Sequence, residues 1–338
     1  MTSSATSSAP AVTLADIQAA AQRIKGHAVR TPLIESPALN RVVGGRILVK
    51  PEMLQRTGSF KFRGAFNTVS QIPERLRPAG VVAFSSGNHA QGVAAAAAQL
   101  GMPSTILMPA DAPAIKVEST RAWGAEIVFF DREKDDREAL ARKLAADKGA
   151  YVVPPFDHPH VIAGQGTIGL EIAEDVKALG VKPDAVVVPC GGGGLIAGTS
   201  TAIAGALPGV PVYAAEPAGF DDTIRSLKSG QREKAQPGAK SWCDALLAPM
   251  PGEITLAINR RTLAGGFAVT DDEVARAIAL AFLHLKLVVE PGGAVALAAV
   301  LSGKIEARNR TIVVVCSGGN IDPGVFASAL KRAELVNN

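Results

Sequence analysis

Residues 184–198 read DAVVVPCGGGGLIAG, an apolar run followed by four consecutive glycines and a second apolar run. The run 185–188 is typical of a buried strand in a parallel sheet, and the residues after Gly194 are typical of a helix. Backbone N–H groups gather where a helix begins, and glycines let an anion approach them closely. A merely tight turn is the alternative, but four glycines cost conformational entropy, which favours a phosphate site.

A strand–helix alternation extends over most of the chain. Strand-like runs occupy 81–85, 104–108, 125–130 and 150–153. Helix-like stretches between them occupy 89–100, 113–123 and 133–147. Beyond residue 160 we predict a helix over 166–179 and strands over 184–190, 211–216, 267–270 and 311–317. Such alternation builds parallel sheets through crossover helices. We therefore predict an α/β protein of two parallel-sheet units, each three layers thick, with a cleft between them.

The same rhythm predicts how the chain divides. Residues 1–12 are rich in Ser, Ala and Thr and are expected to form a disordered tail. Residues 81–159 are expected to form a small substrate domain. The large cofactor domain is expected to combine residues 13–80 with residues 160–338.

Composition excludes several classes of function. The 338 residues carry a formal net charge of +4, and no run of like charges is typical of a nucleic-acid-binding arm. No apolar run approaches the length of a membrane span, and the N-terminus lacks the pattern of a signal peptide. Three dispersed cysteines, Cys190, Cys243 and Cys316, predict neither a disulfide framework nor a zinc site. We therefore expect a cytoplasmic protein without a nucleic-acid or membrane partner.

The glycine turn also has a second interpretation. Gly192, Gly194 and Ala197 match the dinucleotide-binding pattern G-x-G-x-x-G/A. Glu216 ends the next predicted strand, about 20 residues on, where an acid that binds ribose would stand. A nicotinamide-dependent oxidoreductase that uses this turn is therefore an alternative function.

Further candidate segments carry small polar residues. Lys61 lies between two phenylalanines in the turn TGSFKFRGA, where desolvation would lower the pKa of its amine, although a surface lysine is the ordinary interpretation. SSGNH (85–89) and CSGGN (316–320) follow predicted strands, where open α/β sheets bind ligands, although an N-cap by Ser86 or Asn88 would also explain the first. Glu290 in EPGGA has a functional role or caps the following helix.

Taken in order, SFKFRGA, SSGNHAQG, AGQGT (163–167), CGGGGLIAG, EPGGA and CSGGN resemble the serine/threonine dehydratases and serine racemases. Those proteins are pyridoxal-5′-phosphate (PLP) enzymes of fold type II, with a tryptophan synthase β-like fold. The resemblance spans about residues 14–330 and implies the short type, without a C-terminal regulatory domain. It also implies PLP as the cofactor, a small amino acid as the substrate and a homodimer.

The resemblance implies roles for individual residues. Lys61 would form a Schiff base with the cofactor and move the Cα proton, with Ser86 as acid or base on the opposite face. Asn88 would meet the ring hydroxyl, Ser317 the pyridine nitrogen and the glycine turn the phosphate. The residues expected to bind the cofactor are Phe60, Lys61, Asn88, Gly191, Gly192, Gly193, Gly194, Glu290 and Ser317. Those expected to hold the substrate carboxylate are Ser85, Ser86, Gly87, Asn88 and His89.

The expected reaction follows from Ser317. A hydroxyl leaves the pyridine nitrogen essentially neutral, so a carbanion is less delocalised and promptly loses a β-hydroxyl group. We therefore expect a carbon–oxygen lyase, a dehydratase (ammonia-lyase) that converts a β-hydroxy amino acid of the L-serine, L-threonine or 3-hydroxyaspartate type into a 2-oxo acid and ammonia. The alternatives are an amino acid racemase acting through Lys61 and Ser86, the nicotinamide oxidoreductase, and a PLP- or amino-acid-binding protein without turnover.

Two details concern a cation and the substrate. By resemblance, Glu216, the carbonyl of Phe220 and Asp222 would bind Mg²⁺ or Ca²⁺, although Asp222 could simply begin a helix over 222–229. Where relatives commonly carry Ala-Asp-Gly beside the substrate, this chain has WCDA (242–245), in which a methyl group replaces the glycine. The pocket is therefore expected to differ from one for plain serine or threonine. A substrate β-carboxylate would need an additional cation, which the sequence does not single out.

Overall fold

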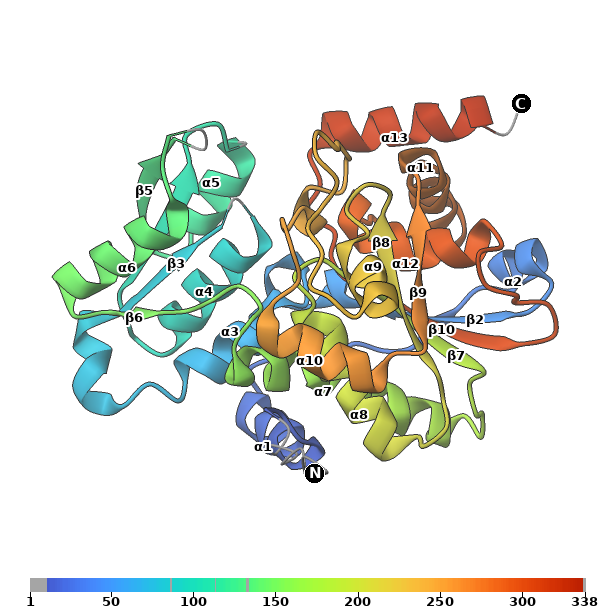
Figure 1. The fold of residues 1–338 in the computed structure, drawn as a ribbon, viewed down its shortest axis with the longest axis horizontal. Helices are drawn as coiled ribbons and strands as arrows, with labels where there is room; N and C mark the ends of the chain where they lie inside the picture. The colour runs from blue at the N-terminus through green and yellow to red at the C-terminus, as the bar shows by residue number, and fades with distance from the viewer. Residues whose placement is uncertain (1–10, 86, 113, 132–133, 337–338) are drawn as a thin grey trace, which may run out of the picture.

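The computed structural model describes residues 11–85, 87–112, 114–131 and 134–336. In this part of the chain the strands form one sheet of six strands and one of four, which lie apart in the molecule (Figure 1). Every strand pairing is parallel except that of β1 with β2. Both sheets are covered by helices on their two faces, so the predicted fold class is confirmed.

The larger sheet has the strand order β1-β2-β10-β7-β8-β9. Its strands are β1 (Ile34–Glu35), β2 (Arg46–Pro51), β7 (Ala185–Pro189), β8 (Val212–Pro217), β9 (Gly265–Val269) and β10 (Thr311–Cys316). Successive side chains of a strand point to opposite faces. Val187 and Val314 therefore pack with α11 (Asp271–Leu280) and α12 (Pro291–Leu301), whereas Val186 and Val313 pack with α7 (Pro159–Ala178) and α8 (Gly194–Ala206).

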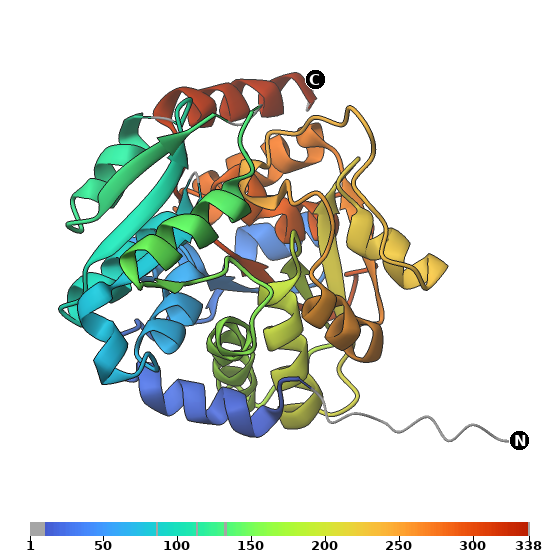
Figure 2. The ribbon, with the colours of Figure 1, turned by 60° about the vertical axis from the view of Figure 1, so that its left-hand side comes forward.

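The smaller sheet has the order β5-β4-β3-β6, and the same alternation covers its faces. Its strands are β3 (Val81–Phe84), β4 (Ser104–Pro109), β5 (Glu126–Phe130) and β6 (Tyr151–Val152). Val81 and Ala83 pack toward α3 (Lys61–Val69), α4 (Asn88–Gln99) and α5 (Ala114–Arg121). Val82 and Phe84 pack toward α6 (Arg137–Lys148) on the opposite face (Figure 2).

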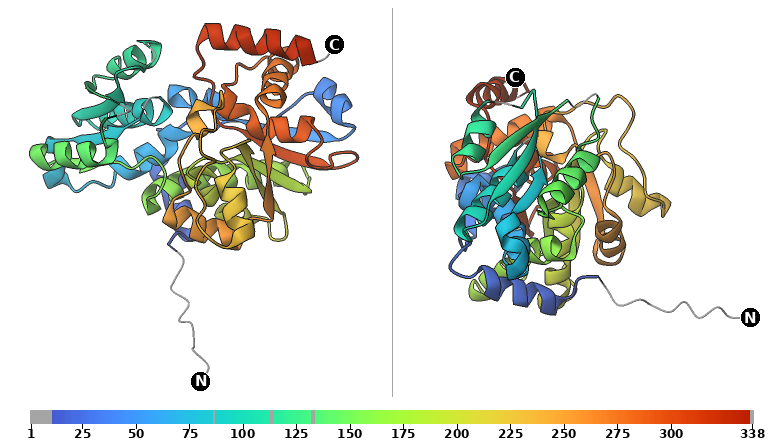
Figure 3. Two further views of the ribbon diagram at one scale, coloured as in Figure 1. Left: turned by 45° about the horizontal axis from the view of Figure 1, so that its top comes forward. Right: turned by 90° about the vertical axis from the view of Figure 1, so that its left-hand side faces the viewer.

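Close helix packing holds the larger unit together and joins it to the smaller one. α7 and α8 of the larger unit cross in close contact, which glycine permits, since a Cβ at Gly198 would lie 2.2 Å from the carbonyl oxygen of Ile162. α3 packs on both α4 and α7, so it contacts both units. The remaining α-helices are α1 (Leu14–Ile24), α2 (Pro37–Val43), α9 (Asp222–Ser229), α10 (Glu253–Thr262) and α13 (Pro323–Val336), and a π-helix spans Ala281–Leu285. Figure 3 shows the two units from two further directions.

Some element boundaries differ from the prediction. α7 begins at Pro159 rather than at residue 166, because Pro159 suits a first helical position and the His158 side chain accepts from the N–H of His160. Lys61, expected in a turn, begins α3. The expected tail 1–12 falls mostly outside the described residues, but Val12 at its end is buried. No helix in the described ranges is both long enough and apolar enough to span a membrane.

Candidate active site

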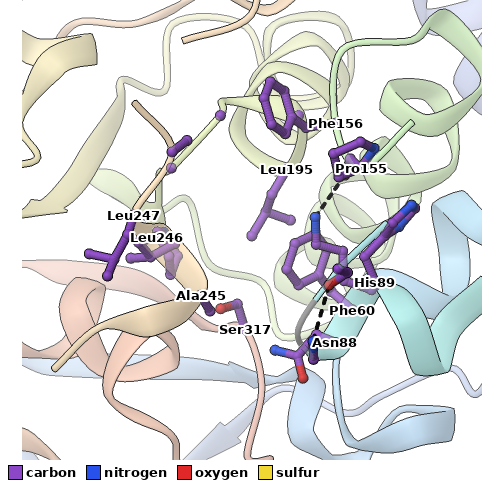
Figure 4. A pocket seen from close by; sticks show the side chains of 18 of the residues that line it. Phe60, Asn88, His89, Pro155, Phe156, Leu195, Ala245, Leu246, Leu247 and Ser317 are labelled. Atoms are coloured by element: carbon purple, nitrogen blue, oxygen red, sulfur yellow. Dashed lines mark hydrogen bonds between the residues drawn. The ribbon is translucent and has the colours of Figure 1, made fainter. Parts of the chain in front are cut away.

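A pocket of about 160 Å³ lies between the two units, at the carboxyl ends of β3, β7 and β10. Open α/β sheets bind ligands at this end of their strands. The turn after β7 and Ser317 after β10 meet there because the two strands are neighbours, with Val187 opposite Val314. Figure 4 shows Ser317, Asn88, Phe60 and His89 around the same space, with Leu246 and Leu247 on the opposite side.

Lys61 places its amine in this pocket. Its Nζ donates a 2.7 Å hydrogen bond to the carbonyl oxygen of Pro155 and lies 5.2 Å from the centre of the Phe60 ring. Burial lowers the pKa of the Lys61 amine to about 8, against the opposing effect of Glu290. The lowered pKa enlarges the unprotonated, nucleophilic fraction of the amine, so this lysine is suited to covalent chemistry.

The loops that carry Lys61 and Ser317 are joined to each other. Ser59 forms an antiparallel bridge with Gly318, and the N–H of Phe60 donates to the carbonyl of Ser317 over 3.1 Å. Thr57 has a left-handed backbone with φ of 61°, and its carbonyl accepts a 2.7 Å hydrogen bond from the side-chain amide of Asn320. These contacts hold the lysine and the Ser317 hydroxyl in one rigid arrangement.

The glycine turn is a cradle from which side chains are excluded. A Cβ at Gly192 would lie 2.4 Å from the ring of Phe156, and Gly193 has a left-handed backbone with φ of 93°. The Thr255 hydroxyl donates a 2.7 Å hydrogen bond to the carbonyl of Gly192, which orients the turn. Because α8 begins at Gly194, its free N–H groups face this space and suit a phosphate.

Asn88 and Glu290 form a polar pair beside the lysine. The Asn88 amide donates a 2.6 Å hydrogen bond to Oε1 of Glu290, and Oδ1 of Asn88 accepts one of 2.7 Å from Asn320. Burial, with the nearby charge of Asp244, raises the pKa of the Glu290 carboxyl to about 8. Glu290 precedes α12, but its side chain makes no cap hydrogen bond, so the structure does not show the helix-capping role. The carboxyl group contacts Asn88 instead.

The segment after β3 lines the pocket at the start of α4. Ser85, Gly87, Asn88 and His89 are among the lining residues, whereas Ser86, the expected second acid or base, lies outside the described residues. Nε2 of His89 lies 2.9 Å from the carbonyl oxygen of Val153. Burial, followed by the charge of Lys61, lowers the pKa of His89 to about 3, so its imidazole is neutral at neutral pH.

Comparison with known proteins agrees with this geometry. The model of the pyridoxal-phosphate dependent enzyme family matches residues 24–318. This chain belongs to that family. It is 43% identical to an L-threo-3-hydroxyaspartate ammonia-lyase of Pseudomonas sp, covering 94% of this chain and 98% of the relative. It is 38% identical to a serine racemase of Schizosaccharomyces pombe, covering 94% and 97%. The crystal structure of a T.th. threonine deaminase superposes with a TM-score of 0.86 at 42% identity, covering 92% and 99%.

The dinucleotide pattern does not come together as a site in this PLP-family protein. Glu216 is fully buried and is not among the residues lining the pocket. Its carboxylate accepts hydrogen bonds from the backbone N–H groups of Thr223 (3.2 Å) and Ile224 (2.8 Å). Because Glu216 does not line the pocket that contains Gly192, the oxidoreductase alternative lacks its second element.

Several pocket residues were not predicted. Phe156 covers the glycine turn, and Pro155 receives the Lys61 amine, but neither belongs to a motif. Lys116 and Arg137 line the pocket from α5 and α6, where the sequence shows only ordinary helix surface. Asp244 also lines the pocket and lies in the WCDA segment. The departure of this segment from the family pattern was the one sequence feature that could have indicated Asp244 as a pocket residue.

Proposed function

We propose that this protein is a PLP-dependent dehydratase (ammonia-lyase) that eliminates water from a β-hydroxy amino acid of the L-serine, L-threonine or 3-hydroxyaspartate type. The products are a 2-oxo acid and ammonia. The observation that carries this proposal is the Lys61 amine, with a pKa of about 8, in one pocket with the glycine turn and Ser317. The names of the Pseudomonas ammonia-lyase and of the threonine deaminase support the reaction class.

The pocket fits PLP. The phosphate would lie on the turn Gly191–Gly194, where a side chain would clash with Phe156, and Lys61 would hold the cofactor covalently. Phe60 would pack on the ring, Asn88, positioned by Glu290, would meet the ring hydroxyl, and Ser317 the pyridine nitrogen. When bound, PLP supplies an electron sink for negative charge at the substrate Cα.

The chain's own residues would bind the substrate and move protons. Ser85, Gly87, Asn88 and His89 would hold the substrate α-carboxylate at the N-terminal end of α4, where backbone N–H groups favour anions. In its unprotonated form, which burial favours by lowering the pKa to about 8, the Nζ of Lys61 would accept the Cα proton. The proton taken from Cα would balance the departure of the β-hydroxyl as water, and the resulting enamine would hydrolyse to the 2-oxo acid and ammonia.

Racemisation on the same site is the second candidate function. It is favoured by the likeness to the Schizosaccharomyces pombe serine racemase. Racemisation needs a second acid or base on the face of the substrate opposite Lys61, and we assign that role to Ser86. A Ser86→Ala variant is expected to lose racemisation while retaining elimination.

We also propose a divalent cation, Mg²⁺ or Ca²⁺, at Glu216, Asp222 and the carbonyl of Phe220. Oδ2 of Asp222 is buried without a hydrogen-bond partner, and burial raises the pKa of Asp222 to about 7. Burial and the charge of Asp222 raise the pKa of Glu216. Two buried acids with raised pKa values suit a hard cation, although the described residues contain no group of three or more His, Cys, Asp or Glu side chains placed to hold a metal. Mg²⁺ or Ca²⁺ should raise the melting temperature of the wild type, but not of Asp222→Asn.

The domain division, assembly and location are also proposals. The smaller sheet falls within the substrate domain proposed for 81–159. Exposed apolar side chains at Phe282, Leu283 and Val325 support a homodimer, which light scattering would test. Three buried free cysteines are consistent with a reducing, cytoplasmic setting.

The proposed function is tested by the visible absorbance spectrum of the purified protein. We expect a yellow band that borohydride removes, with the label on Lys61, and no such band in Lys61→Ala. L-serine, L-threonine and L-threo-3-hydroxyaspartate are then added in turn, and 2-oxo acid and ammonia are measured. A protein that stays colourless with added PLP, or a coloured one that releases no 2-oxo acid from any of these substrates, would contradict the proposal.

A further inference from the structure

The AGQGT segment (163–167) lies within α7, and one of its side chains reaches the pocket. Gln165 lines the pocket together with Val161, which stands four residues earlier on the same face of the helix. Gln165 is only 1% exposed, so its amide group is enclosed by the protein. A buried amide normally has hydrogen-bond partners for both its oxygen and its nitrogen.

The amide of Gln165 has a fixed orientation. Its Oε1 accepts a 3.2 Å hydrogen bond from the backbone N–H of Gly64, three residues after Lys61 on α3. A backbone N–H can only donate, so the amide oxygen must face it, and the nitrogen is the end left without this partner. In the ranges that the structure describes, Nε2 donates to no protein group, yet it is not one of the fully enclosed polar atoms that lack a partner. Nε2 is therefore accessible from the pocket.

The glycine turn at the start of α8 lies next to this part of α7. The two helices cross at Gly198, where a Cβ would lie 2.5 Å from the backbone nitrogen of Gly166, the neighbour of Gln165. α8 begins at Gly194, about one helical turn before this crossing, and Leu195 points into the same pocket (Figure 4). The crossing thus brings the free N–H donors of Gln165 close to the end of α8 that suits a phosphate.

The cations of the pocket have other contacts. Within the described chain these cations are Lys61, Lys116 and Arg137. Lys61 would be used in the covalent bond to the cofactor, Lys116 is paired with Asp244, and Arg137 lies against the ring of Phe84. None of these contacts places a cation at the glycine turn. A phosphate on the turn would therefore be held by neutral N–H donors, and hydrogen bonds to an anion are stronger than those between neutral groups.

We propose that Gln165 is a further cofactor-binding residue, whose amide nitrogen donates a hydrogen bond to the phosphate group on the turn Gly191–Gly194. This inference rests on the proposed PLP-dependent function and adds a residue to its cofactor site. The two ends of one amide would then connect the first turn of α3, which carries Lys61, with the phosphate at the other end of the cofactor.

The test separates the donor of Gln165 from its acceptor. Gln165→Glu keeps an oxygen for the N–H of Gly64 and removes the N–H donors, whereas Gln165→Met removes both without adding charge. Gln165→Asn, which shortens the amide without adding charge, serves in place of Gln165→Met if that variant does not fold. For each variant the dissociation constants of PLP and of pyridoxal, which lacks the phosphate, are measured by absorbance titration of the protein freed of cofactor. Thermal unfolding reports the stability of each variant.

Gln71→Met is the matched control. Gln71 is a half-buried glutamine beyond the end of α3, does not line the pocket, and donates a 2.6 Å hydrogen bond to the carbonyl of Asn67. The control therefore removes an amide and its hydrogen bond near the same helix without touching the proposed phosphate contact. Gln71→Met should bind PLP and pyridoxal as the wild type does.

We expect the preference for PLP over pyridoxal to fall by about tenfold in both Gln165→Glu and Gln165→Met, because only PLP carries the phosphate. The affinity for pyridoxal itself should change much less. An unchanged preference, with both ligands weakened equally, would mean that Gln165 acts only through α3 and would overturn the inference. A preference that falls in Gln165→Glu alone would also overturn it, because repulsion by the new charge would then explain the loss.

Failure of the proposed function gives a different result. If the wild type binds neither PLP nor pyridoxal, the PLP-dependent function fails. Calorimetry with inorganic phosphate then decides the role of Gln165. Weaker phosphate binding by Gln165→Met than by the wild type and Gln71→Met would support the contact, and equal binding or no binding would overturn it.

Discussion

Asn88 at the start of α4 and Glu290 before α12 are joined by a 2.6 Å hydrogen bond that spans the two units of the protein. The donor belongs to the smaller unit and the acceptor to the larger one. Glu290 is 2% exposed, and its backbone N–H donates to the carbonyl of Gly318, next to Ser317. The pair therefore positions one side of the pocket relative to the other through a carboxyl group that is uncharged over most of the neutral range.

Glu290→Gln should remove a pH dependence of stability. Burial raises the pKa of this carboxyl from 4.5 to about 8, so between those values the folded protein holds a proton that the unfolded chain has released. The free energy of unfolding of the wild type should fall as the pH rises through this window, and that of the variant should fall less. Urea denaturation between about pH 5 and about pH 8 measures both slopes. Equal slopes would show that Glu290 is ionised in the folded state.

Gly192→Ala should weaken binding of the cofactor. The added methyl group would lie 2.4 Å from the Phe156 ring, so the turn or the ring must move. We expect the dissociation constant of PLP, measured by absorbance titration, to rise by about tenfold or more. Gly324→Ala is the matched control, since its Cβ would meet only the Asp322 carboxylate, at 3.1 Å. Adding Phe156→Leu to Gly192→Ala should recover part of the loss, and an unchanged dissociation constant in Gly192→Ala would speak against a phosphate at this turn.

Arg63→Met should strongly destabilise the fold. Two residues after Lys61, the buried guanidinium donates to Glu52 (2.8 Å) and to Glu171 (2.6 Å). Its loss leaves the fully buried Glu52 carboxylate without this cation, which should cost about 3–5 kcal/mol in urea denaturation. Arg30→Met is the control: Arg30 is 50% exposed, pairs with Glu174 and Asp175, and should cost less than about 1 kcal/mol. Similar losses in both variants would mean that burial does not decide the effect.

Asp157→Ala should loosen α10 and, through it, the glycine turn. The Asp157 carboxylate accepts hydrogen bonds from the backbone N–H groups of Glu253 (2.9 Å) and Ile254 (3.0 Å), at the start of the helix that carries Thr255. We expect a loss of about 0.5–2 kcal/mol of stability and weaker PLP binding, because Thr255 orients Gly192. Thermal unfolding and PLP titration measure the two effects. Asp157→Asn, which keeps an acceptor, should retain most of the stability and most of the PLP affinity. If Asp157→Asn loses as much as Asp157→Ala, the negative charge of Asp157 is responsible rather than its hydrogen bonds.

The parts of the site that the sequence predicted are motifs in which the functional residues directly follow a strand and begin a helix. The glycine turn follows β7 directly, and SSGNH follows β3, so each motif carries its own strand and helix end. The sequence allowed Asp222 either to bind a cation or to begin a helix. The structure places it at the first position of α9, as the second role requires. Glu216 shows the limit of spacing as a guide, because the buried carboxylate turns to backbone N–H groups that no pattern in the sequence reveals.

By itself, the sequence determined the α/β class, the alternation of strands and helices, and the motifs that would face a ligand. These depend on hydrophobic periodicity and on the backbone freedom of glycine, both of which act within a few residues. Only the tertiary structure decided that β10 lies between β2 and β7, which brings Ser317 to the glycine turn. It also decided that Phe156 covers Gly192, and that Asp244 engages Lys116 while Arg137 lies on Phe84. Such pairings join segments that are distant in the chain, so they depend on how the sheets and helices pack.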